Sequence, residues 1–338
     1  AVIGGGFTGL STAFHAAKAG KSVAVLEAHS LVWGASGRNG GMATTGLAIG
    51  FRDAIKRYGE QRAVDYFREY NKAIDLIEDL VTENDLAVDY ARCGKMNLAA
   101  KESHWQGMQK TGAALQRLVE QPVTLLGRDD IRSEIGSDAY HGAMVDPLGA
   151  GLHVAKFGHE LGRLAVEAGA TIHEQAEVYD LTRRGTGTVH DLQTTRGKIR
   201  AGKVILGTSG YTGKPFGWNQ RRLIPVGSFI IVTEPLPQDV VDDILPNRRM
   251  ASDSNNFIHY FRITPDNRLL FGGRARFALS DPSQDRESGE ILRKAMHRIF
   301  PQTRDARVEY MWGGLVDISM DQMVHAGVHD GIFYSVGY

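Results

Sequence analysis

Residues 4–9, with the sequence GGGFTG, constrain the fold of this chain more than any other feature. They follow a short apolar run and match the pattern G-x-G-x-x-G, and about 20 residues later an acid, Glu27, closes a second apolar run. In this pattern Gly4 makes the tight turn out of a strand, Gly6 lets backbone amides approach a pyrophosphate, and Gly9 lets a helix pack close to the sheet. The pattern therefore predicts a dinucleotide site, in which helix N–H groups hold the pyrophosphate and Glu27 accepts hydrogen bonds from a ribose.

The helix after this turn is predicted from the spacing of its apolar residues. Between Leu10 and Ala17 they recur at i, i+3, i+4 and i+7, and Gly20 follows as the expected stop. The first strand begins only three residues before the turn, so we expect the complete protein to extend further on the N-terminal side.

Composition excludes several classes of partner. The 338 residues are enough for two domains, and 39 Lys and Arg balance 39 Asp and Glu, which argues against binding to nucleic acid or to an anionic membrane. No uninterrupted apolar stretch reaches about 18 residues, so we expect no membrane span. A single cysteine, Cys93, excludes an internal disulfide and a cysteine-based zinc site. It fits a reducing compartment, so we expect a cytoplasmic protein without a metal site.

The order of patterns along the chain predicts a discontinuous nucleotide-binding domain. Strand and helix patterns of the nucleotide-binding type occur at the start, around residues 152–206 and at the end, whereas residues 224–273 are rich in strand-forming residues. We therefore predict a mixed α/β fold, with a Rossmann-like domain and an inserted β-rich substrate domain. The nucleotide-binding domain is predicted to comprise residues 1–92, 142–225 and 310–338, and the inserted domain residues 93–141 and 226–309.

Individual elements are predicted from the same periodicities. Helices are expected at residues 51–81, 103–119, 152–168 and 291–299. Strands are expected at residues 96–98, 123–126, 171–173, 189–192, 199–206, 228–232, 257–262, 269–273 and 331–336, and glycine-rich turns in the remainder of 311–338.

Several blocks of sequence, in the same order along nearly the whole chain, carry a family resemblance. The blocks are residues 2–11, 34–41, 204–212, 233–236, 260–262, 266–273, 312–314 and 334–338. Together they resemble the FAD-dependent amine and amino-acid oxidoreductases of the D-amino-acid-oxidase superfamily, of the glycine-oxidase and sarcosine-oxidase type. Within that class the chain is most similar to the gamma-glutamylputrescine oxidoreductase group.

The resemblance implies FAD as the cofactor and extends the site beyond the opening turn. In relatives the loop at residues 34–41 lies beside the flavin ring and the ribityl-pyrophosphate, and Arg38 there would offset negative charge, with a surface salt bridge as the alternative. Val178 would contact the adenine edge through its backbone, and residues 208–210 would line FAD. The predicted cofactor residues are Gly4, Gly6, Phe7, Thr8, Gly9, Glu27, Ala28, Gly34, Ala35, Ser36, Arg38, Asn39, Gly40, Gly41, Val178, Thr208, Ser209, Gly210 and Gly337.

The implied reaction is oxidation of a primary or secondary amine, a CH–NH or CH–NH2 donor. Hydride transfer from the α-carbon of the neutral amine to FAD gives an imine that water hydrolyses to an aldehyde. Relatives that oxidise amino acids hold the carboxylate with an arginine, but residues 311–323 contain none, and Leu315 and Val316 occupy that place. This favours a small-molecule amine like gamma-glutamylputrescine over a D-amino acid, glycine or sarcosine. Two alternatives are a non-catalytic FAD-binding subunit and a nicotinamide-dependent dehydrogenase, the latter supported by the opening motif alone.

Electron transfer out of the flavin is left open by the sequence. Sarcosine-oxidase-like relatives carry a lysine over the flavin that helps reaction with oxygen, and the matching residues 268–273 contain none. The acceptor is therefore either O2 or another electron acceptor. Relatives also continue after the residues that match Gly337 and Tyr338 into a glycine-rich turn and a helix, so we expect the cofactor site to be completed beyond this sequence.

Tyr260, Arg262 and Arg274 are the candidate catalytic residues. In a strand Tyr260 and Arg262 point to the face opposite His259 and Phe261, so only one pair faces the substrate. We expect Tyr260 on the substrate side, with a packed core tyrosine as the alternative. Arg262 or Arg274 would hold a remote acidic group of the substrate, with a strand-edge salt bridge as the alternative for each.

His325 and Cys93 are weaker candidates for the site. By similarity His325 lies near the cofactor end, but a lone histidine in a turn is more often structural. Cys93 does not match the position of the cysteines that bond covalently to flavin in some relatives.

Overall fold

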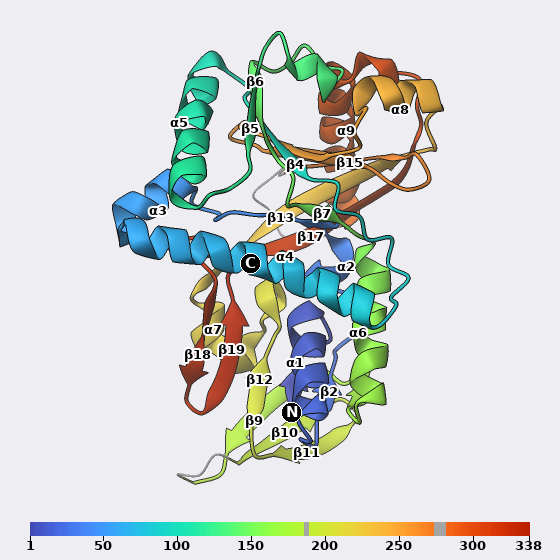
Figure 1. The fold of residues 1–338 in the computed structure, drawn as a ribbon. Coiled ribbons are helices and arrows are strands. Elements are labelled where there is room, and N and C mark those ends of the chain that lie inside the picture. The colour runs from blue at the N-terminus through green and yellow to red at the C-terminus, as the bar shows by residue number, and fades with distance from the viewer. Residues whose placement is uncertain (186–188, 274–281) are drawn as a thin grey trace. The chain divides into compact units, whose positions relative to one another are not determined.

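The computed structural model describes residues 1–185, 189–273 and 282–338, and the chain forms two compact units (Figure 1). Unit 1 consists of residues 1–39, 154–226 and 314–338, and unit 2 consists of residues 40–153 and 227–313.

Unit 1 is built on a six-stranded sheet with the strand order β18-β19-β12-β1-β2-β8. Five of these strands are parallel to their neighbours, and only the edge strand β18 runs antiparallel, beside β19. The strands are β1 (Val2–Ile3), β2 (Ala24–Leu26), β8 (Thr171–His173), β12 (Val204–Leu206), β18 (His325–His329) and β19 (Ile332–Val336). A parallel sheet with helices between its strands is the Rossmann-like arrangement that the sequence predicts.

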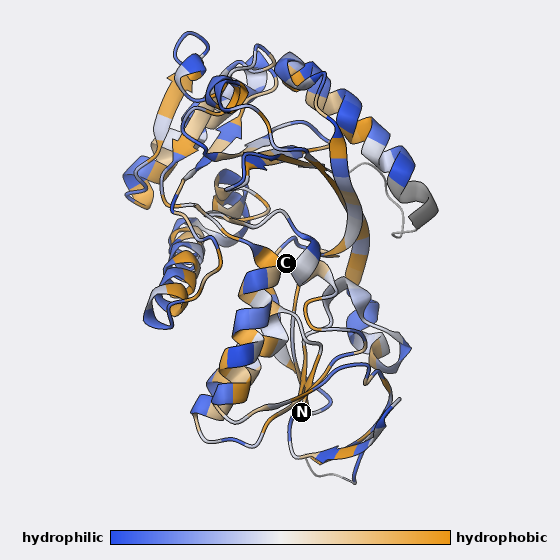
Figure 2. Cartoon of the chain, turned by 90° about the vertical axis from the view of Figure 1, so that its right-hand side faces the viewer, coloured by the Kyte–Doolittle hydropathy of each residue, from blue (hydrophilic) through white to orange (hydrophobic). Residues whose placement is uncertain are grey.

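Helices α1 (Phe7–Lys18) and α6 (Val154–Glu167) pack against one another in unit 1. Hydrophilic and hydrophobic residues alternate along such helices, so that each buries one side (Figure 2). Gly20 ends the first helix as predicted: it has φ +74° and its N–H donates to the Ala17 carbonyl.

The remainder of unit 1 is a small antiparallel sheet with short helical turns. Its strands are β9 (Val178–Arg183), β10 (His190–Thr194) and β11 (Gly197–Ala201), in the order β11-β10-β9. The single strand predicted at residues 199–206 is wrong, because Gly202 and Lys203 separate β11 from β12 and the two strands belong to different sheets. The short helices are α2 (Ala35–Arg38), η2 (Ser209–Tyr211), η3 (Lys214–Phe216) and α7 (Gly217–Gln220).

Unit 2 contains most of an eight-stranded sheet with the order β17-β13-β16-β15-β14-β4-β6-β5. The strands are β4 (Lys95–Leu98), β5 (Thr124–Gly127), β6 (Gly142–Asp146), β13 (Leu223–Thr233), β14 (Met250–Asp253), β15 (His259–Ile263), β16 (Leu269–Gly273) and β17 (Val308–Ser319). The turns predicted after Met311 are partly wrong, because residues 308–319 form the long strand β17. Its glycines stay extended since pairing in the sheet outweighs their low strand preference.

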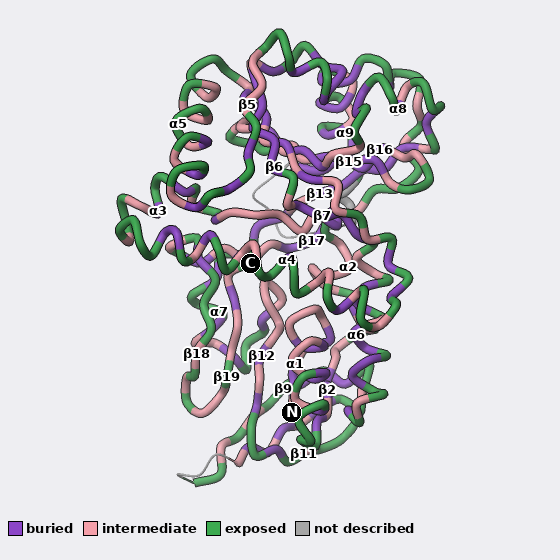
Figure 3. Tube along the Cα trace, in the orientation of Figure 1, coloured by how far each residue is buried: buried purple, intermediate pink, exposed green. Residues whose placement is uncertain are grey.

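One face of this sheet carries the hydrophobic core of unit 2. Phe261, Phe271 and Met96 pack there against α8 (Gln238–Ile244) and α9 (Pro282–Ile299). Strands β6 and β16 are buried along their whole length, and buried residues are purple in Figure 3. The other helical elements are α3 (Phe51–Tyr58), α4 (Glu60–Glu83), α5 (Glu102–Leu118), η1 (Ile131–Ser133) and η4 (Pro301–Thr303). The described part of the chain has no helix that combines the length and apolarity needed to cross a membrane.

The boundaries of the two units differ from the predicted domain boundaries. Residues 40–92 and 142–153 group with unit 2 and not with the nucleotide-binding segments. The physical reason is strand pairing: β3 (Met42–Ala43) pairs with β7 (Ala150–Gly151), and β6 lies between β4 and β5. These pairings are made between segments far apart in sequence, so no local pattern announces them.

Candidate functional site

The carboxyl ends of four parallel strands meet at one edge of the unit 1 sheet. Ile3 of β1 pairs with Leu26 of β2 and with Leu206 of β12, and Leu206 pairs with Tyr334 of β19. The residues that follow these strands, which are Gly4, Glu27, Thr208 and Gly337 with their neighbours, therefore gather at this edge. Ligands of open α/β sheets bind there, and most of the predicted cofactor residues lie at this edge.

The glycine turn at this edge is so tight that side chains are excluded from it. Gly4 has φ +102°, and a Cβ on it would lie 2.6 Å from the Gly207 carbonyl oxygen. A Cβ on Gly9 would lie 1.9 Å from the Gly4 carbonyl oxygen, which is less than any real contact. Both positions require glycine, as the sequence pattern predicts.

The N-terminus of α1 opens directly after this turn. An α-helix leaves its first N–H groups without partners inside the helix, and its dipole favours a negative charge there. The Phe7 N–H donates to Ser36 Oγ at 3.0 Å, and a Cβ on Gly6 would lie 2.8 Å from the same oxygen. The loop that follows β2 thus places Ser36 beside the turn, and the two predicted parts of the site come together.

Glu27 lies at the end of β2 with its carboxylate directed to the same turn. Its Oε2 accepts the Gly5 N–H at 2.6 Å, and its Oε1 accepts the His29 N–H at 2.8 Å. Each carboxylate oxygen has a second lone pair, so these bonds leave capacity for ribose hydroxyls. The ribose contact itself stays a prediction.

Val32 positions the loop of the candidate site, and sequence reasoning missed it. It has φ +63°, which is a strained conformation for a β-branched side chain. Its N–H donates to the Gly5 carbonyl at 3.0 Å, and its side chain packs where Gly158 of α6 has no Cβ. A Cβ on Gly37 would lie 2.1 Å from its carbonyl oxygen. Val32 therefore fixes the loop against the glycine turn. In the sequence, this role is reflected in Gly37 and Gly158, which leave room for Val32.

Residues 34–39 form the short helix α2 and its ends, all in unit 1. The Arg38 Nε donates to the Trp33 carbonyl at 2.7 Å, and its guanidinium lies 4.5 Å from the centre of the Trp33 ring. Asn39 Nδ2 donates to the Ser36 carbonyl at 3.0 Å. Gly34 packs against the ring of Tyr211. The contacts that Arg38 makes to the local backbone and ring orient it, and its role toward FAD stays a prediction.

Asp317 of β17 joins two other predicted segments, and sequence reasoning missed it too. Ser209 Oγ donates to its Oδ1 at 2.8 Å, and the Gly337 N–H donates to its Oδ2 at 2.8 Å. The side chain is buried, with 2% of its surface exposed. The available signal was an acid within an otherwise apolar stretch between Leu315 and Ile318.

Val178 and Ala28, two further predicted cofactor residues, both lie near the unit 1 sheet and differ in how far they are buried. Val178 begins β9 and is buried in the unit 1 core with Ile3, Leu26 and Leu206. Ala28 follows Glu27 and is half-buried. Burial of the Val178 side chain leaves only its backbone for a ligand, which is the contact that the family resemblance implies.

The geometry of unit 1 fits a dinucleotide, the class of ligand to which FAD belongs. The glycine turn has no room for a Cβ and is followed by the N-terminus of α1, which provides N–H donors for a pyrophosphate. Glu27, at the end of β2, provides acceptors for a ribose.

Tyr260 and Arg262 lie on the face of the unit 2 sheet that is opposite its core. Phe261, between them, is fully buried in that core. The Arg262 Nε donates to the Gly40 carbonyl at 2.8 Å, and Nη2 donates to the Leu152 carbonyl at 2.9 Å. Burial lowers the pKa of Arg262. The strand-edge salt bridge is wrong for Arg262, because β15 is an interior strand and the guanidinium binds carbonyl groups.

Tyr260 lies across two glycines and belongs to a row of polar side chains. A Cβ on Gly272 would lie 2.3 Å from its ring, and one on Gly40 would lie 3.1 Å from it. Its hydroxyl is 3.1 Å from Ser228 Oγ. Strand register places Ser252 opposite Tyr260 and Asn97 opposite Ser252, and Ser252 Oγ donates to Asn97 Oδ1 at 3.3 Å. We call Asn97, Ser252 and Tyr260 the polar row.

The remaining candidates do not gather at one place: Gly40, Gly41 and Cys93 belong to unit 2, and His325 belongs to unit 1. Gly40 and Gly41 belong to unit 2, so the unit boundary divides the predicted loop after Asn39. Arg274 lies outside the described residues. His325 Nε2 is 2.7 Å from Asp321 Oδ1. Burial alone would raise the pKa of Asp321, but the hydrogen bonds that it accepts hold the pKa at about 2. Cys93 is a free, half-buried thiol in unit 2.

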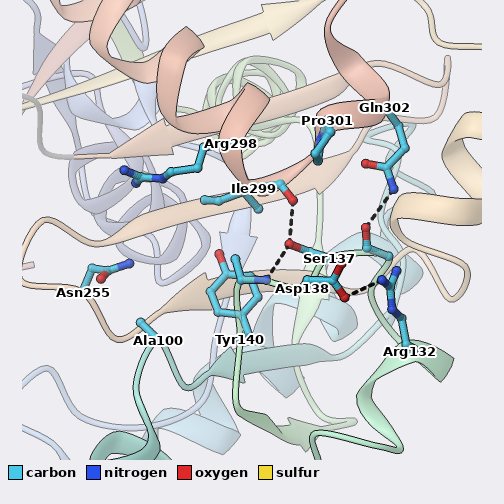
Figure 4. Close-up of a pocket in the computed structure, with 12 residues that line it drawn as sticks. Ala100, Arg132, Ser137, Asp138, Tyr140, Asn255, Arg298, Ile299, Pro301 and Gln302 are labelled. Carbon is cyan, nitrogen blue, oxygen red and sulfur yellow. Dashed lines mark hydrogen bonds and ion pairs between the residues drawn. The ribbon is translucent and has the colours of Figure 1, made fainter.

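A cavity of about 610 Å³ lies on the core side of the unit 2 sheet (Figure 4). Its lining includes the buried Tyr140, together with Asn255 and Arg298. Ser137 Oγ donates to the Ile299 carbonyl in its wall. Burial raises the pKa of Tyr140 well above its usual value, so its hydroxyl stays protonated. None of the predicted site residues that the structure describes lines this cavity, so it is separate from the candidate site.

Lys95 lies on the same face of the sheet as the polar row, beside Asp146, and its protonation should make the stability of the protein depend on pH. Burial lowers the pKa of Lys95 to about 8, although the carboxylate of Asp146 opposes the shift. Asp146 accepts hydrogen bonds from Thr45 and from Gln121. A lysine in the unfolded chain has a pKa of about 10.4. Between these values the unfolded chain binds more protons, so the free energy of unfolding rises with pH.

We expect the Lys95→Met variant to lose this pH dependence. Other groups titrate in both proteins, so the measurement is the difference in unfolding free energy between wild type and variant, from urea unfolding at several pH values. The free energy of unfolding of the wild type should rise relative to that of the variant from about pH 8 to about pH 10.4. Below about pH 8 the difference between the two proteins should stay constant. Parallel curves across this window would contradict the prediction.

Comparisons with known proteins identify relatives along the whole chain. A family model described as "DAO: FAD dependent oxidoreductase" matches residues 1–338. "Probable oxidoreductase OrdL" of Haemophilus influenzae is 33% identical over 344 residues, covering 100% of this chain and 77% of that protein. "Gamma-glutamylputrescine oxidoreductase" of Escherichia coli is 30% identical over 342 residues, covering 100% of this chain and 78% of that protein.

Solved structures share the fold. Glycine oxidase from Geobacillus kaustophilus has a TM-score of 0.79 at 21% identity, covering 99% of this chain and 88% of that chain. The predicted mixed α/β fold is confirmed by this likeness.

Proposed function

Since this chain belongs to the DAO family of FAD-dependent oxidoreductases, we propose that it oxidises a primary or secondary amine whose reacting carbon carries no carboxylate. The match over residues 1–338 confirms the predicted family and the FAD cofactor. The observation that carries the choice of substrate is the absence of arginine from residues 311–323. The family resemblance leads us to expect an arginine there in enzymes that hold an α-carboxylate.

The environment of residues 315 and 316 supports an uncharged substrate group at this place. Leu315 is buried, and its N–H donates to the Tyr211 hydroxyl at 3.2 Å. An apolar pair in a strand gives a carboxylate no charge partner, and burying an unpaired carboxylate is costly. The relative from Escherichia coli is named for gamma-glutamylputrescine, an amine that fits this requirement, and we propose a substrate of that kind.

The residues of unit 1 would hold the cofactor in defined roles. The glycine turn and the N-terminus of α1 would bind the pyrophosphate, and Glu27 would bind the ribose. When bound, FAD supplies the acceptor for the hydride that leaves the α-carbon of the amine, and water then hydrolyses the resulting imine to an aldehyde.

The residues of unit 2 would bind and orient the amine. The polar row offers hydroxyl and amide groups on one face, so an amine would be oriented there by hydrogen bonds. Hydride transfer requires the neutral amine, whereas an aliphatic amine in water has a pKa near 10.4, by analogy with lysine. Arg262 and Lys95 lie on the same face, and like charge disfavours a further cation. We propose that they favour the neutral form of the substrate.

Anaerobic titration of the full-length, FAD-loaded protein tests this proposal. Gamma-glutamylputrescine, putrescine, sarcosine, glycine and a D-amino acid are added separately, and loss of the visible flavin absorbance is recorded. We expect the first two to bleach the flavin and the amino acids to leave it oxidised. Bleaching by glycine or sarcosine alone would instead identify an amino-acid oxidoreductase. Failure with every compound would favour a non-catalytic FAD-binding subunit.

The acceptor and the location of the protein are further proposals. We propose a cytoplasmic enzyme that passes electrons to O2 or to another acceptor. A peroxide assay in air with the amine that bleaches the flavin separates these: stoichiometric peroxide identifies an oxidase, and its absence identifies a dehydrogenase.

A further inference from the structure

We infer that Asp317 is a positioning residue of the cofactor site, whose carboxylate fixes residues 208–210 and 337–338 in the conformations that FAD binding requires. The inference rests on the proposed function only in treating these two segments as parts of the FAD site. Nothing in the family match or in the sequence motifs assigns a role to this acid.

The carboxylate of Asp317 collects donors from both segments. Its Oδ1 accepts from Ser209 Oγ at 2.8 Å and from the Tyr338 N–H at 3.3 Å, and its Oδ2 accepts from the Gly337 N–H at 2.8 Å. Ser209 follows β12 and Gly337 follows β19, which are neighbouring parallel strands. One side chain therefore connects the carboxyl ends of two strands.

Both segments contain a residue with positive φ, and the conformation of Ser209 needs external support. Ser209 has φ +50°, a left-handed conformation that disfavours residues with a Cβ. Gly337 has φ +88°, and a Cβ on it would lie 2.5 Å from the Met323 carbonyl oxygen. Strained conformations persist where the surroundings determine them, and they cluster at functional sites. The hydrogen bonds to Asp317 provide that determination here.

The negative charge of Asp317 is held by hydrogen bonds alone. The side chain is buried, and within the residues that the structure describes no lysine, arginine or histidine forms an ion pair with it. Asparagine has the same shape, but its terminal NH2 group is a donor. This group would face one of the donors, from Ser209, Gly337 or Tyr338, that now bind the carboxylate of Asp317. The variant Asp317→Asn therefore breaks at least one of the bonds without leaving a cavity.

The position of β17 does not depend on this carboxylate. The Leu315 N–H donates to the Tyr211 hydroxyl, and a Cβ on Gly210 would lie 3.2 Å from Leu315 Cβ. The bond to Tyr211, which lies outside the two segments, keeps the strand beside residue 211 when Asp317 is changed. The expected effect is loss of order in the two segments, and the strand itself stays in place.

The test uses the full-length protein from which FAD has been removed, titrated again with FAD. For Asp317→Asn we expect the Kd for FAD to rise at least about tenfold, because hydrogen bonds to a charged group are stronger than neutral ones. The visible absorption band of the bound flavin should also shift, which a purely structural role elsewhere in the fold would not cause. Asp330→Asn is the matched control: Asp330 is an exposed acid of unit 1 that pairs with Arg183, and its variant should bind FAD like the wild type.

Ser209→Ala supplies a second, milder variant. It removes one hydroxyl and should weaken FAD binding by a few-fold, and the double variant should show less than the product of the two single effects because the residues share one bond. Wild-type FAD affinity and spectrum in folded Asp317→Asn would overturn the inference. If that variant does not fold, wild-type affinity in Ser209→Ala would overturn it instead. Failure of the wild-type protein itself to bind FAD would overturn this inference together with the proposed function, whereas a wild type that binds FAD and oxidises no amine would reject the proposed function alone.

Discussion

Replacing Gly9 by alanine is expected to abolish FAD binding and to destabilise unit 1. The new Cβ would lie 1.9 Å from the Gly4 carbonyl oxygen, which is a backbone atom, and Cβ itself is held rigidly by the backbone of residue 9. No side chain can rotate to relieve this contact, so α1 must move away from β1 and the pyrophosphate cradle must widen. We expect the free energy of unfolding to fall by about 3 kcal/mol. The Kd for FAD, measured by fluorescence titration, should rise by at least about 100-fold.

Gly202 provides the matched control for this variant. It also lies in unit 1, and a Cβ on it would meet no atom within 4 Å. Gly202→Ala should therefore keep the stability and FAD affinity of the wild type. Wild-type FAD affinity in Gly9→Ala would show that this turn does not hold the pyrophosphate, and the cofactor site would have to be sought elsewhere.

Replacing Gly272 by alanine is expected to impair amine oxidation while FAD binding is preserved. The new Cβ would lie 2.3 Å from the Tyr260 ring and 2.6 Å from its hydroxyl, so the ring must turn away from the polar row. This contact is relieved by a side chain, so the loss of stability should be small. Misplacement of an orienting group by about 1 Å costs on the order of 100-fold in rate, and we expect kcat/KM to fall by about that factor.

Two further variants separate ring position from the chemistry of the hydroxyl. Tyr260→Phe keeps the ring across Gly272 and removes the hydroxyl that contacts Ser228, so its activity should fall less than that of Gly272→Ala. Gly127→Ala, at the end of β5 in the same sheet, has no atom near its new Cβ and should behave as the wild type. Full activity of Gly272→Ala would show that Tyr260 is a packed core tyrosine and does not bind the substrate.

The elements that were predicted correctly are those that local sequence determines. Helix α6 and strand β8 follow from an apolar stripe that ends before Gly169, and α1 follows from a stripe that ends before Gly20. The predicted helix at residues 51–81 is divided into α3 and α4 by Gly59, which has φ +84° and interrupts the hydrogen-bond ladder. Glycine conformation decides the break, and periodicity alone does not report it.

Local spacing was enough to predict the class of the ligand and the part of its site that residues 4–9 and Glu27 form. Residues 4–9 and Glu27 act within one strand–turn–helix–strand unit, so their spacing already fixes how they meet. The tertiary structure determines the hydrogen bond between Ser209 and Asp317, and it also determines the polar row. Each depends on which strands lie side by side and in what register, and those pairings join residues up to 155 positions apart. Pairing over such distances is set by burial of the whole sheet, which no short pattern contains.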